Sequence, residues 1–285
     1  MTHNGIFHPD DVFAVATALL VFPGSEVIRS RDPEVIELAD VVIDVGMEYD
    51  PERYRFDHHQ DGTVELRTNG VPYAAFGLVW REFGYRLAKQ GAGIIEEKLV
   101  IPIDAPDNNF SLFETTFDNL NPYTIRDYFY SYLPYGHRTE HTLDRVFMQV
   151  VRIAKRLIER EITKAEERAQ GIIEVEQIVE KTSDRRIVVL SRDLPWEPVL
   201  VPRRDVLFVI YPRREGNWAA KSIPKHFQSI ERKKLFPYAW AGKSQTELER
   251  VSGVEGARFC HLGRFIATAD SCEAAVRLAE RALNA

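Results

Sequence analysis

The stretch from Ala39 to Val45 is an apolar run that only Asp40 and Asp44 interrupt. Continuous apolar runs of this length are typical of a strand buried on both faces, as strands are in parallel sheets that helices cover. This run therefore favours an α/β fold with a mostly parallel sheet. Asp44 falls at the carboxyl end of the expected strand, which is where open α/β sheets usually bind ligands.

Other segments fit around such a sheet. Apolar residues recur at helical spacing from Val12 to Leu20 and again from Tyr73 to Ala88, so we expect a helix in each segment. The run from Leu99 to Ile103 repeats the earlier pattern, because an apolar stretch again ends in an aspartate, Asp104. We therefore expect Asp44 and Asp104 to occupy corresponding positions in the sheet.

The chain divides into two domains in this interpretation. A long amphipathic helix is expected from Thr139 to Gln170, and its end at Gly171 marks the boundary. Residues 1–170 form the N-terminal domain, with its mostly parallel sheet flanked by helices. Residues 171–285 form a smaller α/β domain, with three expected strands and a final helix: Ile187–Leu190, Val206–Tyr211, Trp218–Ile223 and Cys272–Leu283.

The composition fits a protein of a reducing cytoplasm. Of the 285 residues, 45% are hydrophobic and 28% charged, and only Cys260 and Cys272 are cysteines, which argues against a disulfide framework or a thiolate zinc cluster. No apolar run approaches the roughly 18 to 20 residues that span a bilayer. The start of the chain lacks the features of a signal peptide or a mitochondrial targeting segment. We therefore expect a cytoplasmic protein without a membrane partner.

The net charge of −6 is unevenly distributed. Residues 171–285 carry 19 basic and 15 acidic side chains, whereas residues 1–170 carry 18 basic and 28 acidic ones. An acidic half joined to a mildly basic half suits a metal-bearing domain beside a domain that holds a polyanion. Chance variation of charge on solvated faces explains the asymmetry equally well, so it supports this interpretation without establishing it.

Three consecutive metal-competent side chains, Asp57, His58 and His59, are hard to explain by packing. Aspartate is almost never fully buried without a partner, and adjacent histidines contribute little to a core. Together they offer hard oxygen and borderline nitrogen ligands to divalent ions. The triplet therefore predicts a metal site.

A second group of possible ligands, His3, His8, Asp10 and Asp11, lies at the start of the first expected helix. Aspartate is a preferred N-cap and complements the helix dipole. One cap needs only one aspartate, however, and here two aspartates stand near two histidines. A metal role is therefore favoured, and the choice between His3 and His8 as ligand stays open.

The segment from residue 110 to residue 138 is rich in Phe and Tyr. Aromatic side chains can stack on bases, but packing around a lid or in a homodimer contact is a commoner use. The pattern does not decide between a lid and a homodimer. His137, Arg138 and His141 follow closely and are candidates to face the site.

In the C-terminal domain, His261-x-Gly263-Arg264 combines a glycine with two side chains that can supply charge. The glycine would let the backbone approach a phosphate. The pattern is as compatible with a structural turn as with a substrate-binding loop. Lys243, earlier in the same domain, is a further candidate to contact an anionic substrate.

Asp44, Asp57-His58-His59 and Asp104 resemble the successive motifs of the DHH phosphoesterase superfamily, which contains single-strand exonucleases, oligoribonucleases, cyclic-dinucleotide hydrolases and manganese pyrophosphatases. The first motif departs from that superfamily, in which one residue separates the two aspartates, because Asp10 and Asp11 are adjacent. More specifically, four stretches spread over nearly the whole chain resemble the family of the melanocyte-proliferating-gene protein: Thr2–Asp11, Asp44–Pro51, Arg55–Gln60 and Gly263–Ile266.

The resemblance implies a DHH-like fold and a metal-dependent phosphodiester hydrolase, since the best-known eukaryotic member is described as a 3′-to-5′ RNA exonuclease. Two divalent ions, Mn²⁺ or Mg²⁺, would be held close together. Mixed His and carboxylate ligation suits Mn²⁺ better than an all-oxygen Mg²⁺ site. The implied metal ligands are His3, His8, Asp10, Asp11, Asp44, Asp57, His58 and Asp104. Asp57 would bridge the ions with Asp44, and His59 would bind a phosphoryl oxygen or protonate the leaving alkoxide.

The implied substrate is RNA or a short oligonucleotide, and the side chains expected to bind it are His261, Arg264, Lys243 and Arg138. The acidic net charge and the lack of a long basic stripe favour smaller alternatives, such as a cyclic dinucleotide, a nanoRNA or pyrophosphate. A metal-stabilised binding protein is the least favoured alternative, because a closed structural site needs about four ligands. Polarity of degradation, physiological metal and oligomeric state are left open.

Overall fold

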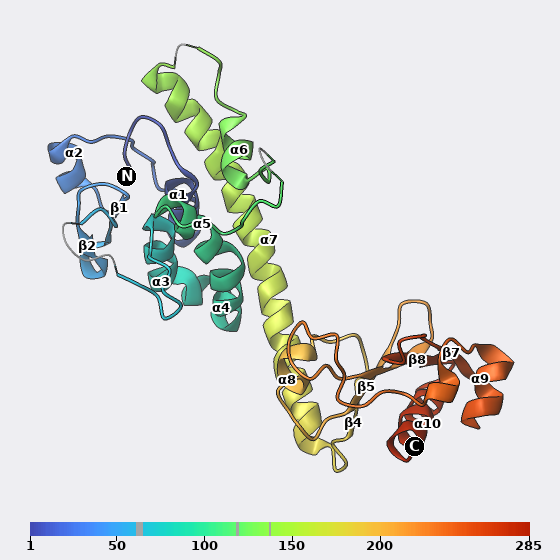
Figure 1. Cartoon of the computed structure of the whole chain (residues 1–285). Helices are drawn as coiled ribbons and strands as arrows, with labels where there is room; N and C mark the ends of the chain where they lie inside the picture. Colours follow the sequence, from blue (N-terminus) through green and yellow to red (C-terminus); the bar gives the residue numbers. More distant parts are fainter. Residues whose placement is uncertain (61–64, 118–119, 137) are drawn as a thin grey trace. The chain divides into compact units, whose positions relative to one another are not determined.

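The computed structural model describes residues 1–60, 65–117, 120–136 and 138–285. The chain divides into two compact units, Met1–Glu167 and Arg168–Ala285, and each is described by itself. Both units combine helices with a sheet, as expected, but the sheet of the first unit is mixed and not mostly parallel (Figure 1). Among the described residues, none of the helices combines the length and the apolar character needed to cross a membrane.

The first unit is mainly helical and carries a small sheet. Its elements in chain order are α1 (Pro9–Val21), α2 (Pro33–Leu38), β1 (Val42–Ile43), β2 (Tyr49–Asp50), η1 (Pro51–Arg53), β3 (Arg55–Phe56), α3 (Ala75–Ala88), η2 (Lys89–Gly91), α4 (Ala92–Ile95), the π-helical turn η3 (Glu96–Val100), α5 (Ile101–Asp107), α6 (Ile125–Tyr130) and the long helix α7 (Glu140–Lys181). Helix α7 continues into the second unit.

The sheet of the first unit is short and mixed. Strand β3 lies between β1 and β2, parallel to β1 and antiparallel to β2. Thr2 extends the parallel part through single bridges to Arg29 on one side and Ile43 on the other. The expected strand over Ala39–Val45 is thus present only as two residues, and Asp44 leaves it with a left-handed backbone (φ 55°).

The strand expected from Leu99 to Ile103 is wrong. This segment is helical, because η3 leads directly into α5, and Pro102 lies in the first turn of α5, where a helix tolerates proline. A continuous apolar run fits a buried helix as well as a buried strand, and periodicity alone does not separate the two. Asp104 therefore lies inside a helix rather than at a strand end.

The core of the first unit fixes the start of α1 in the protein interior. Helices α1, α3 and α7 together contribute most of the buried residues of this core. Phe13 of α1 stacks on Phe76 of α3 with 5.3 Å between ring centroids, and Phe7 packs edge-on against Phe147 of α7 at 5.7 Å. Because residues on both sides of the α1 N-terminus are anchored in this way, the side chains of its first turn are buried.

Helix α7 does not end at Gly171, as expected from the sequence, but continues to Lys181. Val175 and Val179 are buried in the core of the second unit, so the apolar helical pattern persists beyond Gly171. A Cβ atom at Gly171 would lie 2.7 Å from Cδ of Pro195. This glycine therefore permits close packing and does not terminate the helix.

The second unit is built on one mixed sheet. After α7 come β4 (Ile187–Val189), α8 (Glu197–Leu200), β5 (Phe208–Pro212), β6 (Trp218–Ser222), η4 (Tyr238–Trp240), α9 (Gln245–Ser252), β7 (Ala257–Cys260), β8 (Ile266–Ala269) and α10 (Cys272–Leu283). The strand order is β4-β5-β6-β8-β7, with only β4 and β5 parallel. The three expected strands and the final helix are present, and the hairpin β7–β8 is additional.

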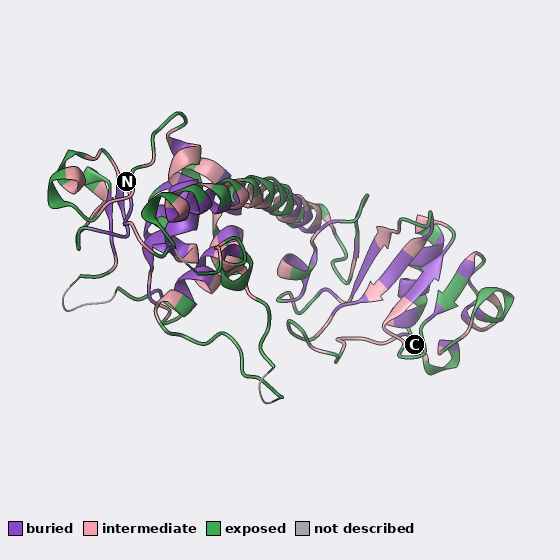
Figure 2. Cartoon of the chain, turned by 90° about the horizontal axis from the view of Figure 1, so that it is seen from above, coloured by how far each residue is buried: buried purple, intermediate pink, exposed green. Residues whose placement is uncertain are grey.

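Alternate residues of β5 face opposite sides of this sheet, as the period of two requires. Phe208 and Ile210 pack in a core with Ala275 and Leu278 of α10. Val209, between them, packs in a separate core with Val179 of α7. The sheet is therefore covered on both faces, which explains why β5 is apolar without interruption (Figure 2).

Candidate metal centre

The N-terminus of α1 buries two carboxylates. The Asp11 carboxylate accepts a hydrogen bond from the His8 backbone N–H through Oδ1 at 3.0 Å, which is the capping role expected of one aspartate. Asp10 and Asp11 are nevertheless both 0% exposed. One oxygen of Asp11 thus serves the helix, and the other oxygen and the whole Asp10 carboxylate remain for another purpose.

The segment before α1 and the end of β1 bring His3 and Asp44 to the same place. His3 Nε2 lies 3.0 Å from Asp11 Oδ2 and 3.3 Å from Asp44 Oδ2. The backbone of Asp44 is left-handed, a conformation that costs a non-glycine residue about 1–2 kcal/mol. Strain of this kind persists where the surroundings require it, often at functional sites. Here it accompanies an aspartate that faces a buried histidine.

His58 joins the same group from the end of β3. Because β1 and β3 are parallel, the residues that follow them leave the sheet at the same edge. His58 Nε2 lies 3.4 Å from Asp44 Oδ1, 3.2 Å from Asp107 Oδ2 and 4.0 Å from Asp10 Oδ2. The expected convergence of the two strand-end motifs is therefore present.

Asp107, the last residue of α5, is a member that the sequence analysis missed. One carboxylate oxygen of Asp107 contacts His58, and the other lies 3.4 Å from His8 Nδ1. Interpreting this segment as a strand put Asp104 at its end. A helical interpretation of the same segment would have put Asp107 there, since α5 ends at that residue.

Asp104 lies one turn earlier in α5 and has different partners. Its carboxylate accepts hydrogen bonds from Arg67 Nη2 at 2.6 Å and from the Gly77 backbone N–H at 3.0 Å. Gly77 is in the first turn of α3, a helix whose own N-cap, Ala74, offers no capping side chain. Asp104 therefore caps α3 and fastens it to α5.

Seven side chains converge, and we call them the acidic-histidine centre: His3, His8, Asp10, Asp11, Asp44, His58 and Asp107. Together with His59 they form three sets of three residues, in which one ligand atom of each residue lies within 4.8 Å of the others. One set is His3, Asp11 and Asp44, and another is His8, Asp10 and Asp107. A third set joins Asp44 and His58 to the neighbouring His59. Both N-terminal histidines thus belong to the centre, in different sets.

The centre contains buried polar atoms without hydrogen bonds to the described residues. Both carboxylate oxygens of Asp10 are of this kind, and Asp11 Oδ2, Asp44 Oδ1 and His58 Nε2 have only ionic contacts between histidine nitrogens and carboxylate oxygens. Buried polar groups of this kind are costly unless something binds them. Carboxylate oxygen and imidazole nitrogen together form a donor set for divalent transition metals. The residues present therefore fit metal ions.

Burial and mutual contacts shift the proton affinities in the centre. Burial raises the pKa of Asp10 well above its usual range, and the nearby charges of Asp44 and Asp107 add to this effect. Burial alone would also raise the pKa of Asp44, but its close contacts with His3 and His58 hold that pKa well below its usual range. Burial would lower the pKa of His3 and His58, yet their aspartate partners raise both to about 10. In the absence of metal, protons on His3, His58 and Asp10 therefore offset the negative charge of the carboxylates.

Asp57 lies beside the centre and is engaged by other donors. Its Oδ2 accepts from the Met47 backbone N–H at 2.6 Å, and its Oδ1 accepts from the His59 backbone N–H at 3.0 Å. The His59 ring joins it, with Nδ1 2.8 Å from Asp57 Oδ1. Burial would raise the pKa of Asp57, but these bonds lower it. Asp57 therefore orients His59, whose side chain is 58% exposed.

The remaining predicted residues lie outside these sets. Arg138 is exposed, and its Nε donates to the Pro134 carbonyl at 3.4 Å. His137 lies outside the described residues. In the second unit, the Lys243 ammonium pairs with the Glu247 carboxylate. His261 and Arg264 lie in the turn between β7 and β8.

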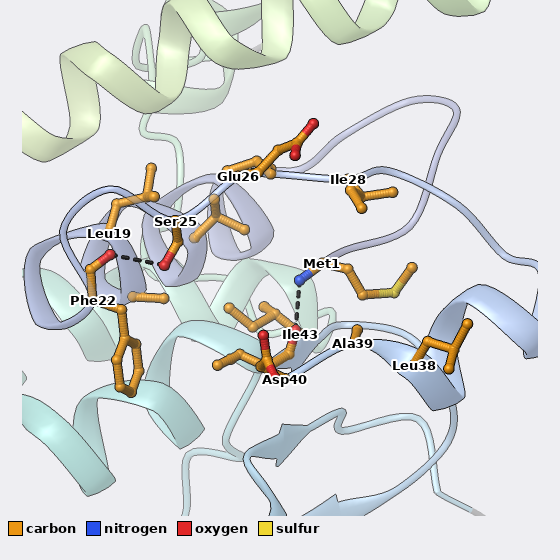
Figure 3. Close-up of a pocket in the computed structure, with 14 residues that line it drawn as sticks. Met1, Leu19, Phe22, Ser25, Glu26, Ile28, Leu38, Ala39, Asp40 and Ile43 are labelled. Carbon is orange, nitrogen blue, oxygen red and sulfur yellow. Dashed lines mark hydrogen bonds between the residues drawn. The ribbon is translucent and has the colours of Figure 1, made fainter.

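A cavity of about 320 Å³ also lies beside α1 and β1 (Figure 3). Its wall is mainly apolar and includes Leu19, Phe22, Ile28 and Ile43, and the amino group of Met1 donates to the Val41 carbonyl at 2.5 Å. None of the side chains of the acidic-histidine centre lines it. The cavity is therefore separate from the candidate metal ligands.

Comparisons with known proteins give one consistent result. The profile of the MYG1 exonuclease family, described as an uncharacterised protein family (UPF0160), matches residues 1–283. A rat protein named MYG1 exonuclease is 29% identical, over 99% of this chain and 84% of its own length. Its human counterpart is 28% identical, over 99% and 85%, and the MYG1 protein of Dictyostelium discoideum is 25% identical, over 99% and 95%. No solved structure matches. The chain belongs to the MYG1 exonuclease family.

Proposed function

We propose that this protein is a metal-dependent phosphodiester hydrolase that acts as a 3′-to-5′ exonuclease on RNA or short oligonucleotides. The observation that carries the proposal is the convergence of the seven side chains of the acidic-histidine centre around the Asp10 carboxylate, which has no hydrogen bond to a described residue. Seven possible ligands exceed the roughly four of a closed structural site. The names of the rat and human relatives support a nuclease. Kinship with the DHH phosphoesterases is part of the proposal.

Two sets of ligands support two ions, Mn²⁺ or Mg²⁺. His3, Asp11 and Asp44 would hold one, and His8, Asp10 and Asp107 the other. His58 contacts Asp44 of the first set and Asp107 of the second. When bound, such ions stabilise negative charge on the phosphoryl group and promote ionisation of a water. The mixture of imidazole and carboxylate ligands favours Mn²⁺. Asp104, which the sequence suggested as a ligand, is better explained by its bonds to Arg67 and Gly77.

Asp57 and His59 supply the acid–base chemistry in this proposal. With the His59 Nδ1–H donated to the Asp57 carboxylate, His59 Nε2 is available to the substrate. The partly exposed ring can then donate a hydrogen bond to a phosphoryl oxygen or protonate the leaving alkoxide. His261, Arg264, Lys243 and Arg138 are proposed to neutralise the substrate, although Lys243 must first exchange its pairing with Glu247.

A second candidate function is hydrolysis of a small phosphoester or of pyrophosphate. The specific observation in its favour is the net charge of −6, because proteins that track long nucleic acids usually present a basic stripe. The third candidate function is that of a metal-stabilised binding protein. Cyclic dinucleotides, nanoRNA and pyrophosphate are the substrates to compare with longer RNA.

The test is hydrolysis of a short 5′-labelled RNA by chelator-stripped protein, with Mn²⁺ or Mg²⁺ added back. Stepwise shortening from the 3′ end should require the metal and be lost in Asp44→Asn. The matched control is Asp40→Asn, an exposed aspartate beside the same strand, which should keep full activity. Undiminished hydrolysis by Asp44→Asn would refute the proposed centre. Tight metal binding without RNA cleavage would instead favour the small-substrate function.

A further inference from the structure

The turn between β7 and β8 holds His261 in one orientation. The Gly263 backbone N–H donates to His261 Nδ1 at 2.9 Å, and the His261 ring packs on Phe265 with 4.4 Å between centroids. A Cβ atom on Gly263 would lie 3.2 Å from that nitrogen and 3.3 Å from Phe265 Cδ1, so glycine permits the contact. Because Nδ1 accepts a hydrogen bond, the neutral ring carries its proton on Nε2. The turn thus presents one fixed N–H donor.

Arg264, the next residue, is held in a strained conformation. Its backbone is left-handed (φ 56°), which a non-glycine residue rarely adopts. The conformation is maintained because the Arg264 carbonyl accepts from the Phe236 N–H at 3.0 Å and its Nη1 donates to the Phe236 carbonyl at 3.2 Å. Among the described residues, no carboxylate forms an ion pair with this guanidinium. Most of its five N–H donors are therefore available.

A second arginine lies against the same aromatic ring. Arg232 places its guanidinium carbon 5.2 Å from the centroid of Phe265. Its Nε is buried and has no hydrogen-bond partner among the described residues. A buried cationic donor without an acceptor is unfavourable. An anion near His261, Arg264 and Arg232 would supply the acceptors that the protein does not.

An exposed aromatic ring adjoins these donors. Tyr238 is 82% exposed, and the Arg264 guanidinium carbon lies 5.4 Å from its ring centroid. A site for a bare anion needs no such ring. Aromatic faces beside phosphate-binding cations are, however, the means by which proteins bind single-stranded nucleotides, since every base can stack on them.

We propose that His261, Arg264, Arg232 and Tyr238, which we call the turn site, bind one nucleoside monophosphate unit. The phosphate is bound by His261 Nε2–H and the two guanidinium groups, and the base stacks on Tyr238. As a statement about the enzyme's substrate this rests on the proposed function, and it makes that substrate a nucleotide rather than pyrophosphate. The binding itself does not depend on hydrolysis.

The experiment is titration calorimetry of the metal-free, full-length protein with AMP, ribose 5-phosphate, adenosine and pyrophosphate. Stacking of one base contributes about 1–3 kcal/mol, so AMP should bind at least about fivefold more tightly than ribose 5-phosphate. Tyr238→Leu should abolish this difference, and Tyr238→Phe should keep it. Arg232→Met should weaken AMP and ribose 5-phosphate alike. Tyr85→Leu, which alters a 68% exposed tyrosine of α3, is the matched control.

Equal affinity for AMP and ribose 5-phosphate in the unaltered protein would overturn the turn site, as would full AMP binding by Tyr238→Leu. The turn site would also be overturned if the unaltered protein bound no AMP and Tyr238→Leu changed the sedimentation coefficient. That result would assign the Tyr238 ring to a contact between protein molecules. Failure of the proposed function would give a different result. The protein would hydrolyse none of the phosphodiesters, yet it would still bind AMP more tightly than ribose 5-phosphate.

Discussion

Asp10 is the residue of the acidic-histidine centre whose burial is least compensated by hydrogen bonds. Both of its oxygens are buried without a described hydrogen-bond donor, and burial raises its pKa well above the usual range. A carboxylate in such a place is stable when protonated or when a cation binds it. If metal binds the centre as proposed, Asp10 would stabilise the metal-loaded protein and contribute little to the stability of the metal-free protein.

Replacing Asp10 with Asn should separate these two states. We expect the metal-free variant to unfold at the same temperature as the parent protein or slightly above it, because a neutral amide needs no proton. At a metal concentration of 100 Kd, the parent gains about 2.7 kcal/mol. A variant with hundredfold weaker affinity gains only about 0.4 kcal/mol at that concentration. Thermal unfolding with and without Mn²⁺ measures both quantities, and an unchanged metal-induced shift would contradict the prediction.

The left-handed backbone of Arg264 reduces the stability of the protein, whereas its side chain belongs to the proposed turn site. Glycine adopts a left-handed backbone without the penalty of about 1–2 kcal/mol that other residues incur. Arg264→Gly should therefore unfold at an equal or higher temperature than the parent protein, despite losing the side-chain bond to Phe236. Its affinity for ribose 5-phosphate should fall about tenfold, as expected for loss of a charge-assisted hydrogen bond. Calorimetry and thermal unfolding of one sample test both, and undiminished phosphate affinity would count against the turn site.

Asp104 gives the protein a pH dependence of stability. Burial raises the pKa of this carboxyl to about 7, against the effects of Arg67 and two backbone amides. The pKa in the folded state thus exceeds the unfolded value near 3.9, so the contribution to stability is largest below pH 4 and is lost as the pH rises toward 7. Between pH 4.5 and 8, the free energy of unfolding of the parent protein should fall by about 2–4 kcal/mol relative to that of Asp104→Asn. Urea unfolding of the metal-free proteins measures this, and parallel pH profiles would refute it.

At the scale of elements, α5 and α3 form the support of the centre. Asp104 of α5 binds the N-terminus of α3, and Arg67 links α5 to η3 through bonds to Asp104 Oδ2 at 2.6 Å and Glu96 Oε1 at 2.6 Å. Asp107, on the same helix as Asp104, faces His8 and His58. The position of Asp107 thus depends on the contact of Asp104 with Arg67 and Gly77, which lies outside the acidic-histidine centre.

Gly77→Ala tests this support. The added Cβ would lie 1.9 Å from Asp104 Oδ2 and 2.3 Å from Arg67 Nη2, so the ion pair must move. We expect a loss of about 2–4 kcal/mol in the free energy of unfolding, together with weaker metal binding. Gly93→Ala in α4 is the matched control, because its Cβ meets nothing within 4 Å and should stabilise the helix by up to about 1 kcal/mol. Equal stability of the two variants would contradict the account.

The elements also show how far sequence reasoning extends. The strand-end position of Asp44 and the crowding of His3, His8, Asp10 and Asp11 were predictable, because each depends on short-range pattern. The parallel strand β3, which precedes Asp57-His58-His59, was not predicted. Asp107 was missed because an apolar run does not distinguish a buried strand from a buried helix. The bonds from Met47 and His59 to Asp57 depend on tertiary geometry, which spacing does not encode.

At the scale of the whole molecule, the two units have opposite charge tendencies, and the chain as a whole carries −6. The turn site contains two arginines without described ion pairs. Recognition of nucleic acid should therefore involve few phosphates. For single strands, the affinity falls with salt at a slope of about −0.7 per neutralised phosphate.

The single phosphate that the turn site binds predicts that affinity for a short RNA falls only about 2.6-fold between 50 and 200 mM salt. Fluorescence anisotropy of labelled RNA on the metal-free protein measures this slope. Tyr238→Leu should lower the affinity at every salt concentration and leave the slope unchanged, because stacking releases no counterions. A decrease of a thousandfold or more would indicate a basic surface that this account lacks.

Helix α5 also limits how the chain can vary in length. Asp104 and Asp107 are separated by one turn, and each inserted or deleted residue would rotate one relative to the other by about 100° and shift it by about 1.5 Å. Asp104 could then no longer bind Arg67 and Gly77 while Asp107 contacts His8 and His58. Residues between them can change in identity, but an insertion or deletion there would disconnect the centre from its support.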